Sequence, residues 1–294
     1  MLPIPYESNF IETNGIRLHV ITAGPKEGKP IMLLHGFPEF WYGWRHQISA
    51  LVQAGFRVIV PDQRGYNLSD VPKGVKVYAL PQLGADIIGL LDHFGIEQVD
   101  LVGHDWGAVV AWGVALTFPQ RVRRLGILNV PHPMVMLHFL RHSPRQMLNS
   151  WYVGFFQIPG LAEWMIKQDN FAAGERAFHT TSQPGTFSDK DIAHYKQAWS
   201  NAGGFTGMIN WYRAMARYRP PNPADLRLHM PVLIQWGKKD AFLMHEMAEE
   251  SLKLCDQGRL IYYDQATHWV QHEAAEQVNL ALVDFLRGKT GNQE

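Results

Sequence analysis

The sequence has little cysteine, no excess of either charge and no long apolar run. Its single cysteine, Cys255, has no partner for a disulfide, and "EESLKLCDQ" predicts that it packs in a helix. Lysine plus arginine and aspartate plus glutamate number 27 each, without blocks of like charge, so nucleic acid and membrane surfaces are not expected partners.

The N-terminus "MLPIPYESNFIETNG" also lacks the basic start and apolar core of a signal peptide. No later segment reaches the roughly twenty apolar residues that cross a bilayer. We therefore expect a cytoplasmic protein without a membrane anchor.

The 46% of hydrophobic residues in the 294-residue chain is enough for a sizeable core. Short β-rich runs alternate with amphipathic stretches of helical length, the pattern of a doubly wound, mostly parallel α/β sheet. The expected strands lie in residues 29–37, 56–65, 98–106, 122–131, 230–240 and 259–268. The clearest expected helices lie in residues 44–55, 80–95 and 276–288.

The alternation stops after residue 132, where the sequence becomes rich in tryptophan, phenylalanine and methionine. We interpret residues 133–228 as an inserted helical cap, and residues 1–132 and 229–294 as the two parts of the α/β core. The proline-rich "YRPPNPADLRLHMP" would lead from the cap back to the sheet.

One carboxylate stands at a sharp turn in "VDLVGHDWGAVVAW", residues 99–112. Gly103, Asp105 and Gly107 match the pattern small-x-nucleophile-x-small between a buried strand and a helix, which holds a nucleophile at the carboxyl edge of a sheet. The alternative is a helix N-cap, a frequent place for aspartate. Residues further along the chain distinguish the two.

In this type of fold, an acid and then a histidine follow the nucleophile in the chain. Asp240 ends the strand-like "PVLIQWGKKD", and His268 ends "RLIYYDQATH", so both lie where strand ends present catalytic groups. Asn129 occupies another strand end, but an amide supplies no negative charge. Asp264 competes for the acid, although we place it within the preceding strand. We therefore predict Asp105, Asp240 and His268 as nucleophile, acid and base.

The segment "HGFP", residues 35–38, follows the apolar "IMLL" and completes this pattern. Alone it is only a turn. Next to the nucleophile, its loop would aim the backbone N–H of Phe37, together with that of Trp106, at a developing oxyanion.

With these motifs the sequence resembles the α/β-hydrolase-fold epoxide hydrolases, close relatives of the haloalkane dehalogenases. The resemblance covers nearly the whole chain and includes "HGFPEFWYGWRHQ", "PDQRGYNLSD", "GHDWG", "WGKKD" and "THWVQHE". It extends to "WYVGFFQIPGLAE" and "NWYRA", where the family carries two tyrosines that bind the epoxide oxygen. These tyrosines fall on Tyr152 and Tyr212.

The resemblance implies hydrolysis of an epoxide to a vicinal diol through a covalent ester on Asp105. An aspartyl ester has a carbonyl that water can attack, whereas serine would be left as a stable ether. The expected partners are a small lipophilic epoxide and water, without a metal or organic cofactor. Aromatic residues near the first tyrosine are candidates for a lipophilic pocket, although each is also suited to packing the cap. These residues are Trp151, Phe155, Phe156, Trp164 and Phe171.

Other functions stay open at this point. A haloalkane dehalogenase would use the same triad with the Trp106 indole as a halide donor, but it needs no paired cap tyrosines. A fluoroacetate dehalogenase would need an arginine at the position of Trp106. Metal-dependent hydrolysis is an alternative because two pairs of histidines have the i, i+4 spacing of metal ligands on a helix. Neither pair has the glutamate of "HExxH" between its histidines. These pairs are His268 with His272 and His138 with His142. A non-catalytic binding protein on the same fold is a further alternative.

Overall fold

The computed structural model describes residues 2–201, 203–219 and 223–288. A single eight-stranded sheet runs through it, in the order β1-β2-β4-β3-β5-β6-β7-β8. The pairs β1/β2 and β2/β4 are antiparallel, and the remaining neighbours are parallel. The predicted doubly wound, mostly parallel α/β sheet is therefore confirmed. The strands are β1 (Tyr6–Thr13), β2 (Ile16–Ala23), β3 (Pro30–Leu34), β4 (Arg57–Pro61), β5 (Val99–His104), β6 (Val122–Leu128), β7 (Leu228–Gly237) and β8 (Cys255–Tyr263).

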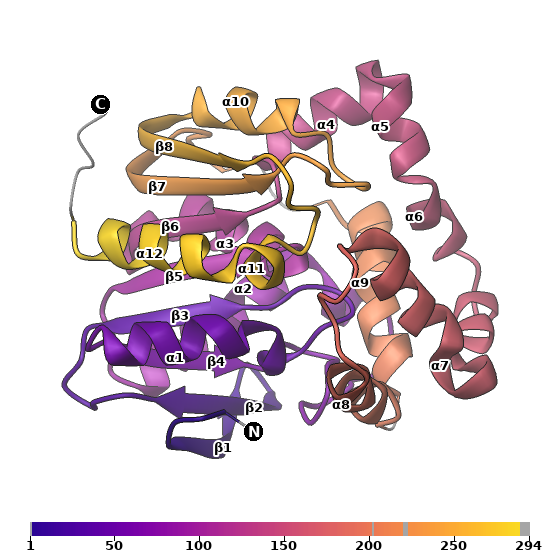
Figure 1. The fold of residues 1–294 in the computed structure, drawn as a ribbon, viewed down its shortest axis with the longest axis horizontal. Helices are drawn as coiled ribbons and strands as arrows, with labels where there is room; N and C mark the ends of the chain where they lie inside the picture. The colour runs from indigo at the N-terminus through magenta and orange to yellow at the C-terminus, as the bar shows by residue number, and fades with distance from the viewer. Residues whose placement is uncertain (1, 202, 220–222, 289–294) are drawn as a thin grey trace.

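Helices cover both faces of this sheet (Figure 1). On one face lie α1 (Arg45–Gln53), α11 (Val270–Glu273) and α12 (Ala275–Leu286), and on the other α2 (Leu80–His93) and α3 (Trp106–Thr117). Each face has its own hydrophobic core, because strands buried on both sides contribute apolar side chains in both directions. All six residues of β5 are buried, so the turn that follows it is held on a rigid strand.

One pair of strands was not predicted, and one local prediction was wrong. The N-terminal hairpin β1–β2 was not expected, although its turn carries Asn14 and Gly15 with positive φ, the arrangement that suits a two-residue hairpin turn. Cys255 was placed in a helix, but α10 (Glu246–Leu252) ends before it and Cys255 begins β8. It is buried there, as a packing residue is.

Between β6 and β7 the described chain forms only helices, which lie beyond the carboxyl ends of the parallel strands (Figure 1). They are α4 (Pro133–His142), α5 (Pro144–Asn149), α6 (Trp151–Phe155), α7 (Leu161–Thr181), α8 (Asp189–Trp199) and α9 (Gly204–Arg217). The long α7 is kinked, with non-helical backbone at residues 168–171. These helices share one hydrophobic core with the sheet, so their treatment as a separate cap domain stays a proposal.

The described part of the chain also contains three short 3₁₀ helices, at Trp41–Trp44, Lys76–Tyr78 and Pro119–Arg121. The proline-rich linker to β7 falls partly outside the described residues. Among the helices that the structure describes, none combines the length and the apolar character needed to cross a membrane.

Candidate active site

Asp105 occupies the sharp turn between β5 and α3. Its backbone has φ +48° and ψ −125°, a conformation that L-residues rarely adopt. The turn is tight enough to require glycine nearby. A methyl group on Gly103 would come within 2.6 Å of Ala108 Cα, and one on Gly107 would overlap the carbonyl of Leu34. The glycines of the motif are therefore needed for the sharp turn at Asp105 to form.

Asp105 occupies the N-cap position of α3, but its side chain makes no capping hydrogen bond to the helix, so capping does not explain the carboxylate. Its Oδ1 accepts a hydrogen bond of 2.6 Å from the backbone N–H of Phe37, in the "HGFP" loop. A methyl group on Gly36 would overlap Asp105, so this loop lies directly against the carboxylate. The backbone N–H of Trp106 belongs to the first turn of α3, where amide groups lack a partner within the helix. Both predicted oxyanion donors thus lie beside Asp105, one of them already bonded to it.

His268 lies between two carboxylates. Its Nδ1 is 2.7 Å from Asp240 Oδ2, and its Nε2 is 3.5 Å from Asp105 Oδ2. Asp240 also accepts hydrogen bonds from the side-chain amide of Asn129 at 2.8 Å and from the backbone N–H groups of Phe242 and Leu243 at 2.8 and 3.0 Å. These donors fix the Asp240 carboxylate, which in turn fixes the imidazole. Asn129 was rejected as an acid, but it holds the acid in place.

The competing acid, Asp264, lies away from this group. It follows the end of β8, which is one correction to its expected place within the strand. Its side chain is 72% exposed and pairs with Lys238 at 2.7 Å. Asp264 is therefore a surface residue, and Asp240 is the carboxylate that contacts the histidine.

Charge decides the protonation of His268 and Asp105. Burial disfavours a charged imidazole, but Asp240 and Asp105 outweigh this effect and raise the pKa of His268 to about 10. Burial likewise favours a protonated Asp105, but the hydrogen bond and charge of His268 hold the pKa of Asp105 below its ordinary value. The resting site therefore holds an imidazolium between two carboxylates. The Asp105 side chain keeps 17% exposure while that of Asp240 has none, so only Asp105 is open to a substrate.

Tyr152 on α6 and Tyr212 on α9 face this group from the cap. Their ring centroids are 5.9 Å apart, and the Tyr212 ring lies 4.8 Å from that of Trp106, next to Asp105. Burial, together with the negative charge of Asp105, raises the pKa of both phenols above their ordinary value. Both hydroxyls therefore stay protonated and are able to donate hydrogen bonds.

The expected pocket residues divide into two groups. Phe156 is buried, with its ring 4.8 Å from Tyr212, and the half-buried Phe155 packs on it at 5.9 Å. In contrast, Trp151 is 69% exposed and Trp164 is 61% exposed, so neither packs into the interior, and their place at a substrate pocket stays a prediction. Helix geometry explains the exposure of Trp151, because a helix that turns Tyr152 inward directs the preceding residue outward.

Phe171 does not belong to this group either. Its backbone lies in the left-handed region at the kink of α7. Its ring stacks on Phe205 at 5.8 Å and contacts Trp199 at 6.0 Å. It packs one cap helix against two others.

A buried polar cluster behind His268 was not predicted. At its centre is Glu39, whose carboxylate accepts hydrogen bonds from Tyr195, Gln271 and His272 at 2.6, 3.0 and 2.8 Å. Burial opposes its charge, but the neighbouring histidines hold the pKa of Glu39 well below its ordinary value. His104 continues the cluster, with its Nε2 2.8 Å from the backbone carbonyl of His268. The only sequence signal was an acidic residue directly after "HGFP".

The histidine pairs considered for a metal do not share a partner. His268 contacts Asp240, whereas His272 contacts Glu39. His142 bonds through Nδ1 to the backbone carbonyl of His138. Within the described residues, no cluster of three or more histidine, cysteine, aspartate or glutamate side chains has an arrangement suited to a metal ion.

Comparisons with known proteins agree with this geometry. A family model described as "alpha/beta hydrolase fold" matches residues 29–275. The chain is 42% identical to "AB hydrolase superfamily protein YfhM" of Bacillus subtilis, covering 95% of this chain and 98% of the relative. It is 37% identical to "Epoxide hydrolase 4" of Mus musculus, covering 95% of this chain and 79% of the relative.

Solved structures give the same result. The crystal structure of a mutant epoxide hydrolase from Bacillus megaterium superposes with a TM-score of 0.87 at 30% identity, covering 95% of this chain and 100% of that one. Epoxide Hydrolase A from Mycobacterium thermoresistibile matches with a TM-score of 0.83 at 32% identity, covering 97% of this chain and 99% of that one. The chain therefore belongs to the α/β-hydrolase family and, within it, to the epoxide hydrolases.

Proposed function

We propose that this hydrolase converts lipophilic epoxides to vicinal diols through an ester on Asp105. One observation carries the proposal: an accessible aspartate at the elbow faces a histidine on one side and two neutral phenols on the other. The rings of Phe37 and Phe156, 5.5 Å apart, lie against Tyr212 and favour an apolar substituent on the substrate.

In the first step, Asp105 Oδ2 attacks an epoxide carbon in line with the breaking carbon–oxygen bond. The ring oxygen becomes an alkoxide, which is far more basic than the epoxide. Hydrogen bonds from Tyr152 and Tyr212 therefore strengthen as the bond breaks, which is the condition for lowering the barrier. A proton passes to the oxygen, and the product of this step is a hydroxyalkyl ester of Asp105.

Ester formation also changes His268. The ester removes one of the two negative charges that raise the pKa of His268 to about 10, so this pKa falls. The proton lost by the imidazolium balances the one gained by the alkoxide. His268 is then a neutral base, still oriented through Nδ1 by Asp240 at 2.7 Å.

In the second step, His268 takes a proton from water, and the hydroxide attacks the ester carbonyl. The Phe37 N–H already bonds an oxygen of Asp105 in the resting site, and the Trp106 N–H is the second donor for the oxyanion that forms. Such donors contribute about 3 to 4 kcal/mol each in comparable sites. Collapse of the intermediate breaks the bond between the carbonyl carbon and the substrate oxygen, which takes the proton of the added hydroxyl. The diol leaves, and the site again holds the Asp105 carboxylate and the imidazolium of His268.

A single turnover in heavy-oxygen water, with enzyme in excess, tests this route. Because the oxygen added to the substrate comes from Asp105, the first diol should be almost unlabelled, and the label should appear in the tryptic peptide that contains "GHDWG". A fully labelled first diol with unlabelled protein would show direct attack by water and refute the ester.

The substrate class needs a separate assay. Turnover of styrene oxide, phenyl glycidyl ether and a fatty-acid epoxide should yield diols, whereas 1,2-dibromoethane should release no bromide. Bromide release without diol formation would identify a haloalkane dehalogenase. Absence of any turnover or covalent adduct would favour the binding protein.

A further inference from the structure

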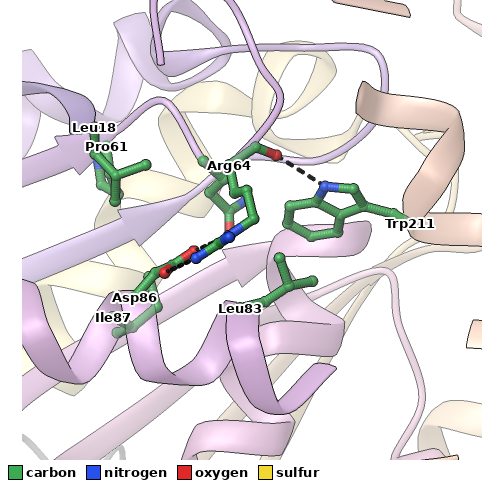
Figure 2. A pocket seen from close by; sticks show the side chains of 8 residues that line it. Leu18, Pro61, Arg64, Leu83, Asp86, Ile87 and Trp211 are labelled. Carbon is green, nitrogen blue, oxygen red and sulfur yellow. Dashed lines mark hydrogen bonds and ion pairs between the residues drawn. The ribbon is translucent and has the colours of Figure 1, made fainter. Parts of the chain in front are cut away.

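A buried ion pair lies beside the cap helix that carries Tyr212 (Figure 2). Arg64 donates from Nε to one oxygen of Asp86 at 2.8 Å and from Nη2 to the other at 2.6 Å. Each of the two side chains is only 4% exposed. Burial raises the pKa of Asp86 above its ordinary value despite Arg64, so the carboxylate is not fully compensated for its lost hydration. A buried ion pair of this kind adds little net stability, so its role is better explained by the geometry that it imposes on the surrounding chain.

The geometry that the pair fixes is that of the loop after β4. The backbone carbonyl of Arg64 accepts a hydrogen bond of 2.9 Å from the indole N–H of Trp211, and this contact is drawn in Figure 2. Directly after it, the loop and α9 touch through their backbones. A methyl group on Gly65 would come within 3.0 Å of Gly207 Cα, and one on Gly207 within 2.7 Å of the Gly65 carbonyl. Helix α9 is therefore seated on this loop without intervening side chains.

Trp211 and Tyr212 are consecutive residues of α9, so they project about 100° apart around the helix axis. Anchoring one of them fixes the rotation of the helix and hence the direction of the other. Trp106, the residue after the nucleophile, contacts both, with ring centroids 5.6 Å from Trp211 and 4.8 Å from Tyr212.

We propose that Arg64, Asp86 and Trp211 are positioning residues that set the rotation of α9 and thereby the place of the Tyr212 hydroxyl over Asp105. The inference rests on the role proposed above for Tyr212. Tyr152 provides an internal reference, because it stands on a different helix, α6, and packs on Phe156 and Phe242 instead.

The test is Trp211→Phe, which keeps a ring but removes the N–H, made in the wild type and in the Tyr212→Phe and Tyr152→Phe backgrounds. The single-turnover rate of ring opening is measured with styrene oxide. In the wild type we expect a rate about three- to tenfold lower, as for the loss of one hydrogen bond. In the Tyr212→Phe background, Trp211→Phe should lower the ring-opening rate by less than about twofold. In the Tyr152→Phe background, it should lower the rate by at least the same factor as in the wild type.

A merely structural role predicts the same factor in both backgrounds, and that result would overturn the inference. A wild-type rate for Tyr212→Phe itself would instead remove the proposed role of Tyr212, which is a separate failure. Trp199→Phe is the matched control, because its indole also donates to a backbone carbonyl, that of Pro38 at 2.6 Å, from a helix without a site tyrosine. Its factor should be equal in the two backgrounds. If Trp211→Phe does not fold, Asp86→Asn should show the same dependence on Tyr212.

Discussion

Asp105→Asn should lower the pKa of His268 in the free enzyme. The variant keeps the size of the side chain but removes its charge, so it imitates the electrostatic state of the ester. Asp105 Oδ2 lies 3.5 Å from His268 Nε2, and an opposite charge at such a distance shifts a pKa by about 1 to 3 units. From a starting value of about 10, the pKa of His268 should therefore fall to between about 7 and 9, with Asp240 as the remaining carboxylate.

The assay is an NMR titration of the imidazole signals between about pH 6 and pH 11. The chain has 14 histidines, so His268→Gln identifies the signal by its loss. Asp264→Asn is the matched control, since this carboxylate is on the surface and should leave the pKa of His268 unchanged. A pKa in Asp105→Asn within about half a unit of the wild-type value would refute the idea that ester formation releases the base.

The same pKa has a consequence for stability. The unfolded chain has an ordinary histidine pKa near about 6.5, below the folded value of about 10. His268 therefore stabilises the folded protein fully below about pH 6.5, and this contribution is lost as the pH rises toward about 10. Urea unfolding of the wild type should show this loss, and Asp105→Asn should show a smaller one.

Three further outcomes are expected. Tyr152→Phe and Tyr212→Phe should each slow single-turnover ring opening about a hundredfold, and the double variant should nearly abolish it; a fast double variant would refute their assignment. Asn129→Ala should lower the free energy of unfolding by about 1 to 3 kcal/mol in urea titrations, because Asp240 loses a buried donor, and an unchanged value would contradict that role. Burial lowers the pKa of His272 to about 4, so the wild type should lose stability as the pH falls from about 6.5 to 4. The His272→Asn variant should lose less stability over this range. Equal losses in the two proteins would argue against a buried neutral imidazole.

The central strands were predictable because they are buried on both faces. The continuous apolar character of β3 to β7 reflects this burial directly, and glycines mark the ends of α1 and α2. Strand β1 lies at the edge of the sheet and has mostly exposed residues, so its apolar signal is weak. The Asn14-Gly15 pair suits a two-residue hairpin turn, but no hairpin was predicted from it.

The candidate site was predictable where a sequence motif specified both the type of a functional residue and its position relative to the strands. The small residues around Asp105, and the order of Asp240 and His268 after it, limit the arrangement to very few choices. Exposure in the cap was not predictable in this way. Trp151 is on the surface and Phe156 is buried, and this depends on how short helices pack, which no local pattern in "WYVGFF" specifies.

The Glu39 cluster was missed for a different reason. Its contacts join residues far apart in the chain: Glu39 bonds Tyr195 and Gln271, more than 150 positions away. A single sequence carries no record of such pairs. The carboxylate in "HGFPEF" indicates only that an acidic residue lies near an apolar turn, and its burial becomes evident when α8 and the segment after β8 are in place.

The triad alone does not choose between an epoxide and a haloalkane, because both need an aspartate nucleophile and a base. In the proposed mechanism, the choice lies in the groups that receive the leaving oxygen, which are the phenols of Tyr152 and Tyr212. Cap side chains donate to the core loops that carry the site: Tyr195 to Glu39, Trp199 to the Pro38 carbonyl and Trp211 to the Arg64 carbonyl. The first two hold α8 on the loop that contains Phe37, the proposed oxyanion donor, and the third holds α9 on the loop after β4. The half-exposed α6, which carries Tyr152, makes no comparable side-chain hydrogen bond to a core loop among the described residues, so the position of Tyr152 depends on ring packing against Phe156 and Phe242.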